Sequence, residues 1–258
     1  MVFPRLIPLL LVHGGRLEKS RRFGDWRYVG DVLNAIKIFN EKDVDELIVL
    51  DVDAARTGRG PDFALLEQLA GECFMPLAYG GGVESADTAR RIMRLGIEKV
   101  VINGAAMRRP SLITEVSDVL GASSTVVSID ATMTRRGAVR FDHRTGAAVK
   151  KESIADRIDE VVAAGAGELV IQSRDRDGTL DGPDLALIRE VTSSVSVPVV
   201  YGGGISSLAD CEAVWSAGVS GVAAGSWFVF RGPHRAVVIT YPRYDLITDA
   251  FERVAAAR

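Results

Sequence analysis

Two long segments of this chain occur twice, at a constant spacing of 122 residues. The matching pairs are 46–66 with 168–188 and 76–106 with 198–228. The motif Tyr79-Gly80-Gly81-Gly82 returns in this way as Tyr201-Gly202-Gly203-Gly204. A single long repeat indicates an internal duplication rather than a solenoid, which is built from several shorter units. The sequence therefore predicts one fold made of two similar halves, roughly residues 1–122 and 123–258.

Short apolar runs alternate with longer amphipathic stretches along the chain. The expected strands are Arg5–Val12, Glu46–Leu50, Met75–Tyr79, Lys99–Ile102, Thr125–Ile129, Glu168–Ile171, Val197–Tyr201 and Gly221–Ala224. The expected helices are Val32–Glu41, Phe63–Ala70, Ala86–Leu95, Leu112–Leu120, Ser153–Ala164, Leu185–Thr192 and Leu208–Ala217. Alternation of this kind predicts an α/β protein with a parallel sheet. Eight units in 258 residues match the size of a single (βα)8 TIM barrel, with an open doubly wound sheet as the alternative.

Charge and cysteine content exclude several functional classes. The net charge of −3 gives no broad basic field for nucleic acid or an anionic membrane. The apolar run near the start of the chain is too short to span a bilayer, so a cytoplasmic protein without a membrane span is expected. Two cysteines, Cys73 and Cys211, provide no disulfide framework and are expected to be reduced.

The two glycine triplets predict a pair of phosphate sites. In such a barrel, binding groups lie on loops that follow the strands. Glycines let the backbone approach a ligand closely, and a following helix offers free N–H groups to an anion. The triplets can also be simple tight turns, but their symmetric placement favours a ligand with a phosphate at each end. The expected phosphate-binding residues are Gly81, Gly82, Asn103, Gly104, Asp177, Gly178, Gly203, Gly204, Gly225 and Ser226.

Carboxylates are the candidate proton-transfer groups. Asp51 and Asp130 each end an expected strand, where an ionised group is costly unless it has a partner or a task. We expect Asp51 to contact substrate and Asp130 to be catalytic, although Asp130 can instead hold loops by hydrogen bonds. Asp177 can likewise be a turn former. The histidines His13, His143 and His234 and the cysteines lack metal-ligand spacing, so neither a metal nor a cofactor is expected.

These residues resemble the cyclase subunit of imidazole glycerol phosphate synthase over essentially the full chain. The matching positions are Arg5, Lys19, Asp51, Gly80-Gly81-Gly82, Asn103, Asp130, Asp177-Gly178-Thr179, Gly203-Gly204 and Gly225-Ser226. The resemblance implies a bis-phosphate substrate, catalytic roles for Asp130 and Lys19, and ammonia supplied by a glutaminase subunit in a heterodimer. It also implies a charged ammonia gate at the barrel base, and Glu98 at the partner interface. The gate residues are Arg5, Glu46, Lys99 and Glu168. These charges can equally form a closed salt-bridge plug.

One departure from this family concerns its proton-transfer pair. The family uses an aspartate at the end of the first strand together with the one that matches Asp130, and this chain has Leu11 there. Leucine cannot move a proton, and general acid–base catalysis contributes roughly 10²–10⁴-fold. Two smaller departures are Gly104 in place of a threonine and Gln172 in place of a small hydroxyl residue.

The chain is also similar to a paralogous group encoded with bacterial surface-polysaccharide genes. The similarity rests on residues 5–11, 27–31, 34–42, 72–77 and 231–242. It implies a role in amidating a sugar of an O-antigen-like polymer, with a glutaminase and possibly a separate sugar amidotransferase. The segment 231–242 is expected to replace the C-terminal helix of the cyclase, or to be a β-like tail that covers the barrel edge. The remaining alternatives are a histidine-pathway cyclase, a non-catalytic ammonia conduit, and a phosphosugar-binding module without a partner.

Overall fold

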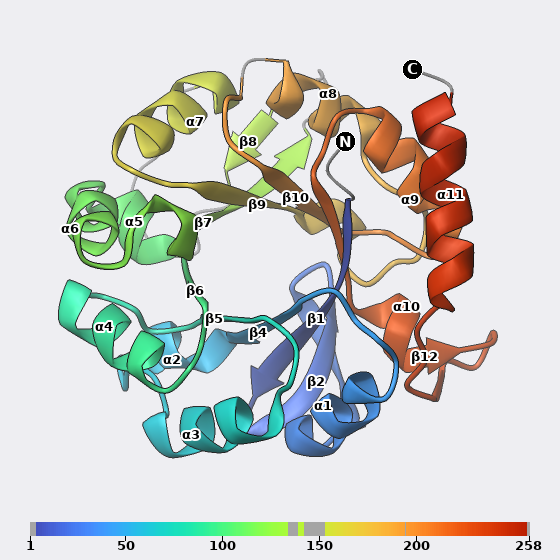
Figure 1. The fold of residues 1–258 in the computed structure, drawn as a ribbon, viewed down its shortest axis with the longest axis horizontal. Coiled ribbons are helices and arrows are strands. Elements are labelled where there is room, and N and C mark those ends of the chain that lie inside the picture. Colours follow the sequence, from blue (N-terminus) through green and yellow to red (C-terminus); the bar gives the residue numbers. More distant parts are fainter. Residues whose placement is uncertain (1–3, 134–138, 142–152, 194, 257–258) are drawn as a thin grey trace.

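The computed structural model describes residues 4–133, 139–141, 153–193 and 195–256, and it shows a closed (βα)8 barrel (Figure 1). Eight parallel strands form the barrel in the order β1, β4, β5, β6, β7, β9, β10, β11, and pairing of β11 with β1 closes it. The barrel strands are β1 (Arg5–His13), β4 (Leu47–Asp51), β5 (Leu77–Gly80), β6 (Lys99–Ile102), β7 (Thr125–Met133), β9 (Glu168–Ser173), β10 (Val199–Gly202) and β11 (Gly221–Ala224). All eight expected strands are present, and closure excludes the open doubly wound sheet.

Helices surround the barrel, as Figure 1 shows. Those expected from the sequence are α1 (Val32–Asn40), α3 (Phe63–Glu72), α4 (Ala86–Arg94), α6 (Ser111–Leu120), α7 (Ile154–Ala163), α8 (Leu185–Thr192) and α9 (Leu208–Ser216). Polar side chains cap the starts of all of these except α6: Asp31, Asp62, Ser85, Ser153, Asp184 and Ser207 each accept a backbone N–H of the first turn. Local sequence therefore fixes where these helices begin.

Several shorter elements were not among the strands and helices expected from the sequence, apart from the alternative of a β-like tail at 231–242. These are β2 (Arg16–Arg21), β3 (Gly24–Gly30), β8 (Val139–Phe141), β12 (Phe230–Arg231), β13 (Ala236–Val237), α2 (Val52–Thr57), α5 (Gly104–Arg108) and α10 (Ser226–Val229). The hairpin of β2 and β3 extends the sheet beside β1, whereas β12 and β13 form a separate two-stranded sheet. Most of these elements lie on the chain that follows a barrel strand, so they build the mouth of the barrel.

The expectation for the end of the chain was wrong in one respect. Segment 231–242 does not replace a C-terminal helix, because α11 (Tyr244–Ala256) follows it. The buried residues of α11 are Ile247, Ala250, Phe251 and Val254, at helical spacing. Phe251 meets the buried Trp215 of α9 edge to face, with 6.5 Å between ring centroids. The apolar face of α11 is therefore buried by packing against α9.

Two separate apolar layers position the site. A large layer lies between strands and helices, and a smaller one fills the barrel interior. The inner layer contains Ile7, Leu9, Leu11, Ile48, Ala78, Val101, Val126, Val170, Val200 and Ala223. Alternate residues of β1 thus point inward. Packed side chains make the lower barrel a solid core, which leaves the mouth as the place for a ligand.

Candidate functional site at the barrel mouth

A cavity of about 610 Å³ opens at the carboxyl ends of the strands. Apolar side chains of β1, β4 and β6 line one part, including Leu9, Leu11, Leu50 and Val101. Polar residues line the rest: Asn103, Ser128, Asp130, Gln172 and Asp177. A concave site with an apolar wall and a few converging polar groups is typical of small-molecule binding.

The first glycine loop borders this cavity, and glycine is required there. An added Cβ on Gly81 would lie 2.6 Å from the Asp51 carbonyl oxygen, and one on Gly82 would lie 2.8 Å from the Cα of Gly60. Gly81 and Gly82 also have positive φ angles of 142° and 65°. The structure brings both together with Asn103 and Gly104 around one cavity. Gly81 and Gly82 therefore line the cavity with backbone alone.

Asp130 is held by a neighbour from the first half. The Asn103 side-chain amide donates to Asp130 Oδ2 at 2.9 Å, and both residues line the cavity. Asp130 does not end its strand as expected, because β7 continues to Met133 and pairs with β8. The carboxylate is only half-buried, so it remains accessible to a ligand.

Asp51 has a local structural task. It ends β4 and caps α2, accepting the N–H groups of Asp53 and Ala54 at 3.1 Å each. Its other oxygen accepts from Arg59. Because three donors already satisfy this buried carboxylate, its geometry favours organising the loop over proton transfer.

Leu11 lies on the inner wall of the barrel and lines the same cavity as Asp130. Its side chain is buried in the apolar layer with Leu9. This part of the cavity wall is therefore apolar.

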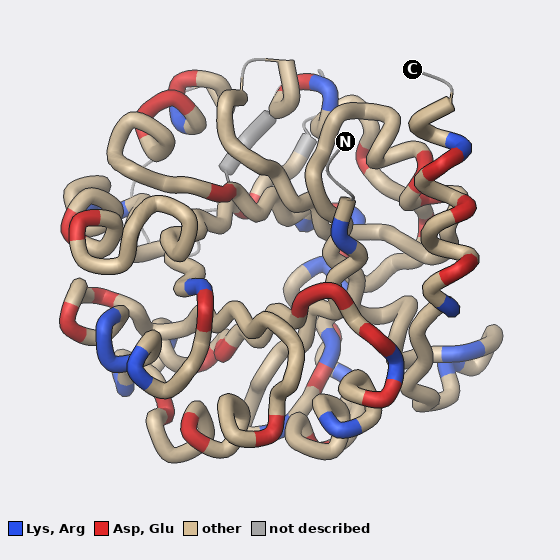
Figure 2. Tube along the Cα trace, viewed as in Figure 1, with Lys and Arg blue, Asp and Glu red and all other residues tan. Residues whose placement is uncertain are grey.

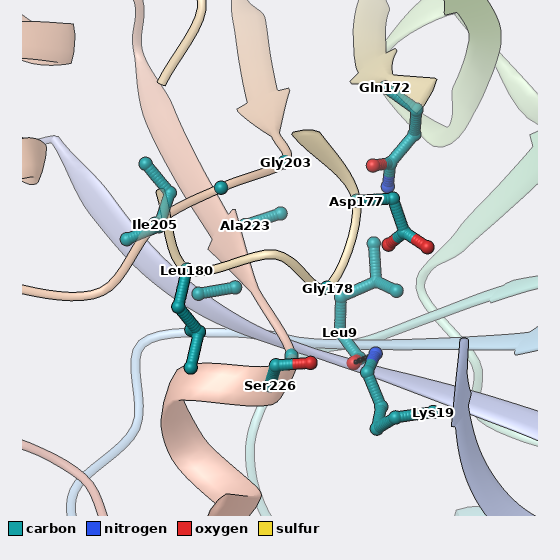
Figure 3. A pocket seen from close by; sticks show the side chains of 13 residues that line it. Leu9, Lys19, Gln172, Asp177, Gly178, Leu180, Gly203, Ile205, Ala223 and Ser226 are labelled. Atoms are coloured by element: carbon teal, nitrogen blue, oxygen red, sulfur yellow. Dashed lines mark hydrogen bonds between the residues drawn. The ribbon is translucent and has the colours of Figure 1, made fainter. Parts of the chain in front are cut away.

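The second glycine loop borders a much smaller pocket of about 20 Å³ (Figure 3). Its lining includes every residue expected for the second phosphate site: Asp177, Gly178, Gly203, Gly204, Gly225 and Ser226. An added Cβ on Gly204 would lie 2.1 Å from the Gly182 carbonyl oxygen. The volume corresponds to about one water molecule. The expected residues thus lie together around this pocket, but little open space remains between them.

Lys19 is the side chain that fills the second pocket. Its ammonium donates to the Leu9 carbonyl at 2.8 Å, and an added Cβ on Gly225 would lie only 1.9 Å from Nζ. Burial lowers the pKa of Lys19 to about 8, although the charge of Asp177 opposes this shift. A buried amine of this kind is suited to contact an anion or to exchange a proton.

Asp177 connects the second pocket to the β2–β3 hairpin. Its Oδ2 accepts from the Ser20 hydroxyl at 2.6 Å and from the Phe23 N–H at 3.3 Å. Gly178 packs directly below, since an added Cβ would lie 2.1 Å from the Ser20 carbonyl oxygen. Asp177 therefore holds the hairpin over the mouth.

Four charged residues close the opposite end of the barrel. Arg5 bonds to Glu46 and Glu168, and Lys99 bonds to the same two carboxylates at 2.7–3.0 Å. Charged positions of both signs surround the central ring of strands in Figure 2. Both glutamates are buried. All four expected gate residues thus meet in one ring, which is shut by ion pairs. Glu98 lies beside this ring and is exposed.

Sequence reasoning missed a cluster at the cavity mouth. His13 Nδ1 lies 2.8 Å from Glu18 Oε2, and its ring stacks on Trp26 with centroids 4.2 Å apart. Asp53 lies near His13 Nε2 at 3.7 Å. The inward alternation of Leu9, Leu11 and His13 along β1 was the available signal, but the hairpin that brings Trp26 back was not visible.

Within the described residues, no three His, Cys, Asp or Glu side chains gather in a possible metal site. His143 lies outside the described residues. No helix in the described part of the chain is long and apolar enough to cross a membrane.

The closed barrel, its glycine loops and its charged base define a (βα)8-barrel protein with a cavity at the mouth. The chain belongs to the histidine biosynthesis protein family, whose match covers residues 5–233. It is 43% identical over 246 residues to "Putative imidazole glycerol phosphate synthase subunit HisF" of Leptospira borgpetersenii, covering 94% of this chain and 96% of the relative.

Two further relatives agree. "Putative imidazole glycerol phosphate synthase subunit hisF2" of Pseudomonas aeruginosa is 46% identical over 243 residues, which cover 94% of this chain and 97% of that protein. "Imidazole glycerol phosphate synthase subunit HisF" of Exiguobacterium sibiricum is 37% identical over 228 residues, with coverages of 88% and 91%. The chain is thus a cyclase-type subunit of the imidazole glycerol phosphate synthase family.

Proposed function

We propose that this chain uses or conducts ammonia from a partner glutaminase, in the cytoplasm, during amidation of a surface-polysaccharide sugar. The observation that supports this role over histidine biosynthesis is Leu11. It gives the cavity wall an apolar side chain where a cyclase needs its second proton-transfer group. A separate sugar amidotransferase would be the final acceptor of the ammonia.

A bis-phosphate compound is the proposed ligand of the mouth. Gly81, Gly82, Asn103 and Gly104 would hold one phosphate, and the pocket around Gly203 and Ser226 the other. The two halves, roughly residues 1–122 and 123–258, would each supply one of these sites. Each glycine loop lines a pocket at the mouth and is followed by a helix, which supports this assignment.

A cyclase assay separates the two branches. Purified protein is mixed with the histidine-pathway bis-phosphate (the ribulosyl aminoimidazole carboxamide intermediate) and excess ammonium at high pH, and loss of substrate absorbance is followed. Binding without turnover is expected. Rapid turnover would instead establish a histidine enzyme that works despite Leu11.

Asp130→Asn separates a catalytic barrel from a passive conduit. In a conduit the complex with glutaminase and amidotransferase keeps its full activity. If Asp130 moves a proton, the same change lowers activity about 10²–10⁴-fold. Asn has nearly the same size as Asp, so this variant tests charge and proton transfer at position 130 rather than packing against Asn103.

The ring at the base is the proposed ammonia entrance, and the surrounding face is the proposed glutaminase interface. Exposed Glu98 beside Lys99 supports this placement. Glu98→Lys should weaken co-purification with the glutaminase encoded in the same genome. Glu84→Lys, a change of equal charge at the mouth, is the matched control. Equal binding by both variants would refute the placement, and no co-purification by the unmodified chain would favour a module without a partner.

A further inference from the structure

Arg235 reaches the second pocket from the turn between β12 and β13. Its Nη2 donates to the Gly178 carbonyl at 2.8 Å and to the Ser226 hydroxyl at 3.3 Å. Both acceptors belong to residues that line the pocket. Arg235 belongs to segment 231–242, so this segment reaches a pocket at the barrel mouth.

The contact with Ser226 determines what its hydroxyl can do. A hydroxyl that accepts from a guanidinium keeps its own proton for another acceptor. In Figure 3 the Ser226 side chain lies at the same end of the pocket as Lys19. Ser226 is therefore oriented as a donor toward any anion that enters beside Lys19.

Unpaired positive charge collects on this side of the mouth. Arg235 and Arg27 both lie over the ring of Phe230, with guanidinium carbons 4.9 and 5.1 Å from its centroid. Burial and the charges of Arg21 and Arg27 lower the pKa of Arg235. Among the described residues, none of these three arginines forms a salt bridge. Like charges held together in this way favour an added anion, although the charge of Asp177 acts on Arg235 in the opposite direction.

The first pocket lacks this arrangement. Its nearby arginines Arg56, Arg59 and Arg108 pair with Asp53, Asp51 and Glu84, respectively. The excess of cations is thus specific to the second pocket.

We propose that Arg235 is a positioning and specificity residue that makes the second pocket selective for a dianionic phosphate group. An entering phosphate would replace the Leu9 carbonyl as the hydrogen-bond acceptor of the Lys19 ammonium. It would also accept a hydrogen bond from the Ser226 hydroxyl. The positive charges of Arg235 and Arg21 would balance its second negative charge. This inference rests on the proposed phosphate site and adds the determinant of its charge preference.

The test is calorimetric titration of the full chain with ribose 5-phosphate and, separately, with nitrate as a monoanion. Arg235→Gln should weaken ribose 5-phosphate binding at the second pocket about tenfold or more, in line with the loss of a charge-assisted contact. Arg235→Lys should retain part of the affinity. Arg231→Gln, an exposed arginine of the same hairpin, should change it less than about twofold. Nitrate binding should change little in all variants.

Gly203→Glu, which blocks the second pocket, provides the reference background. Adding Arg235→Gln to it should cause no further loss, because the two changes share one site. Thermal unfolding of each variant separates misfolding from weakened binding. Wild-type affinity in Arg235→Gln, with binding lost in Gly203→Glu, would overturn the role of Arg235 alone. Absence of ribose 5-phosphate binding by the unmodified chain would overturn both the phosphate site and this inference.

Discussion

The two glycine loops of the barrel share a backbone conformation but differ in their surroundings. Gly81 and Gly203 have φ angles of 142° and 122°, and Gly82 and Gly204 have angles of 65° and 82°. The first loop opens into the large cavity, whereas Lys19 nearly fills the pocket at the second. Duplication thus preserved the turn, and side chains brought from outside the repeat made the two sites different.

The base of the barrel shows the same partial symmetry. Glu46 and Glu168 are equivalent under the 122-residue shift, and both enter the charged ring. Both cations, Arg5 and Lys99, come from the first half, and the shifted positions hold Val127 and Gly221. The duplication therefore supplied one acidic residue of the ring from each half. The first half alone supplies the two basic residues that neutralise them.

The largest effect is expected from removing one of these cations. Among the described residues, Lys99→Ala leaves Glu46 and Glu168 with Arg5 as their one basic partner. Breaking a buried ion pair by deleting one partner costs about 3–5 kcal/mol. Urea unfolding measures this loss of stability. Arg90→Ala, which breaks the exposed pair with Asp87, should cost no more than about 0.5 kcal/mol. Equal losses in both variants would show that the base ring is not important for stability.

The difference between the two pockets predicts a steric effect at Gly225. The equivalent first-half position is Asn103, which already carries a side chain. Gly225→Ala would place a methyl group on the Lys19 ammonium, and overpacking of this kind costs about 1–3 kcal/mol. Gly71→Ala in α3, where nothing lies within 4 Å, is the control and should be neutral or stabilising by up to about 1 kcal/mol. Thermal unfolding compares them; an unaffected Gly225→Ala would mean that Lys19 moves away freely.

A pH series tests the buried ammonium of Lys19. The folded-state pKa of about 8 lies below the usual 10.5, so the unfolded chain binds more protons between these values. Because of Lys19, the free energy of unfolding therefore rises with pH through this window. Between pH 7 and pH 10 the wild type should gain about 2 kcal/mol relative to Lys19→Met. A constant difference in unfolding free energy over that range would show that the amine is not desolvated.

The smallest effect is expected at the first pocket, where cations are already paired. Arg59→Gln removes the partly exposed partner of Asp51. The carboxylate keeps two backbone donors, so the stability loss should stay below about 1 kcal/mol. Chemical denaturation checks this. A loss comparable to that of Lys99→Ala would contradict the view that backbone capping satisfies Asp51.

The order of strands and helices could be predicted because each barrel unit has a local signal. Buried strands read as continuous apolar runs, and Asp or Ser precedes most helices as a cap. The hairpin of β2 and β3 was not predicted, because its residues Arg16–Gly30 are mostly polar. It is held by tertiary contacts such as that of Ser20 with Asp177. The helix α11 was not predicted either, although Ile247, Ala250, Phe251 and Val254 follow helical spacing and give it a buried face.

The duplication, the eight alternating strand and helix units, the glycine turns and the charges of the base could all be read from the sequence, whereas closure of the barrel is seen in the pairing of β11 with β1. These follow from periodicity and from residue types that have few alternatives. The tertiary packing places Lys19 in one pocket and brings Arg235 to Gly178 and Ser226. Such contacts join residues up to 57 positions apart in sequence, and their partners depend on how loops pack across the mouth.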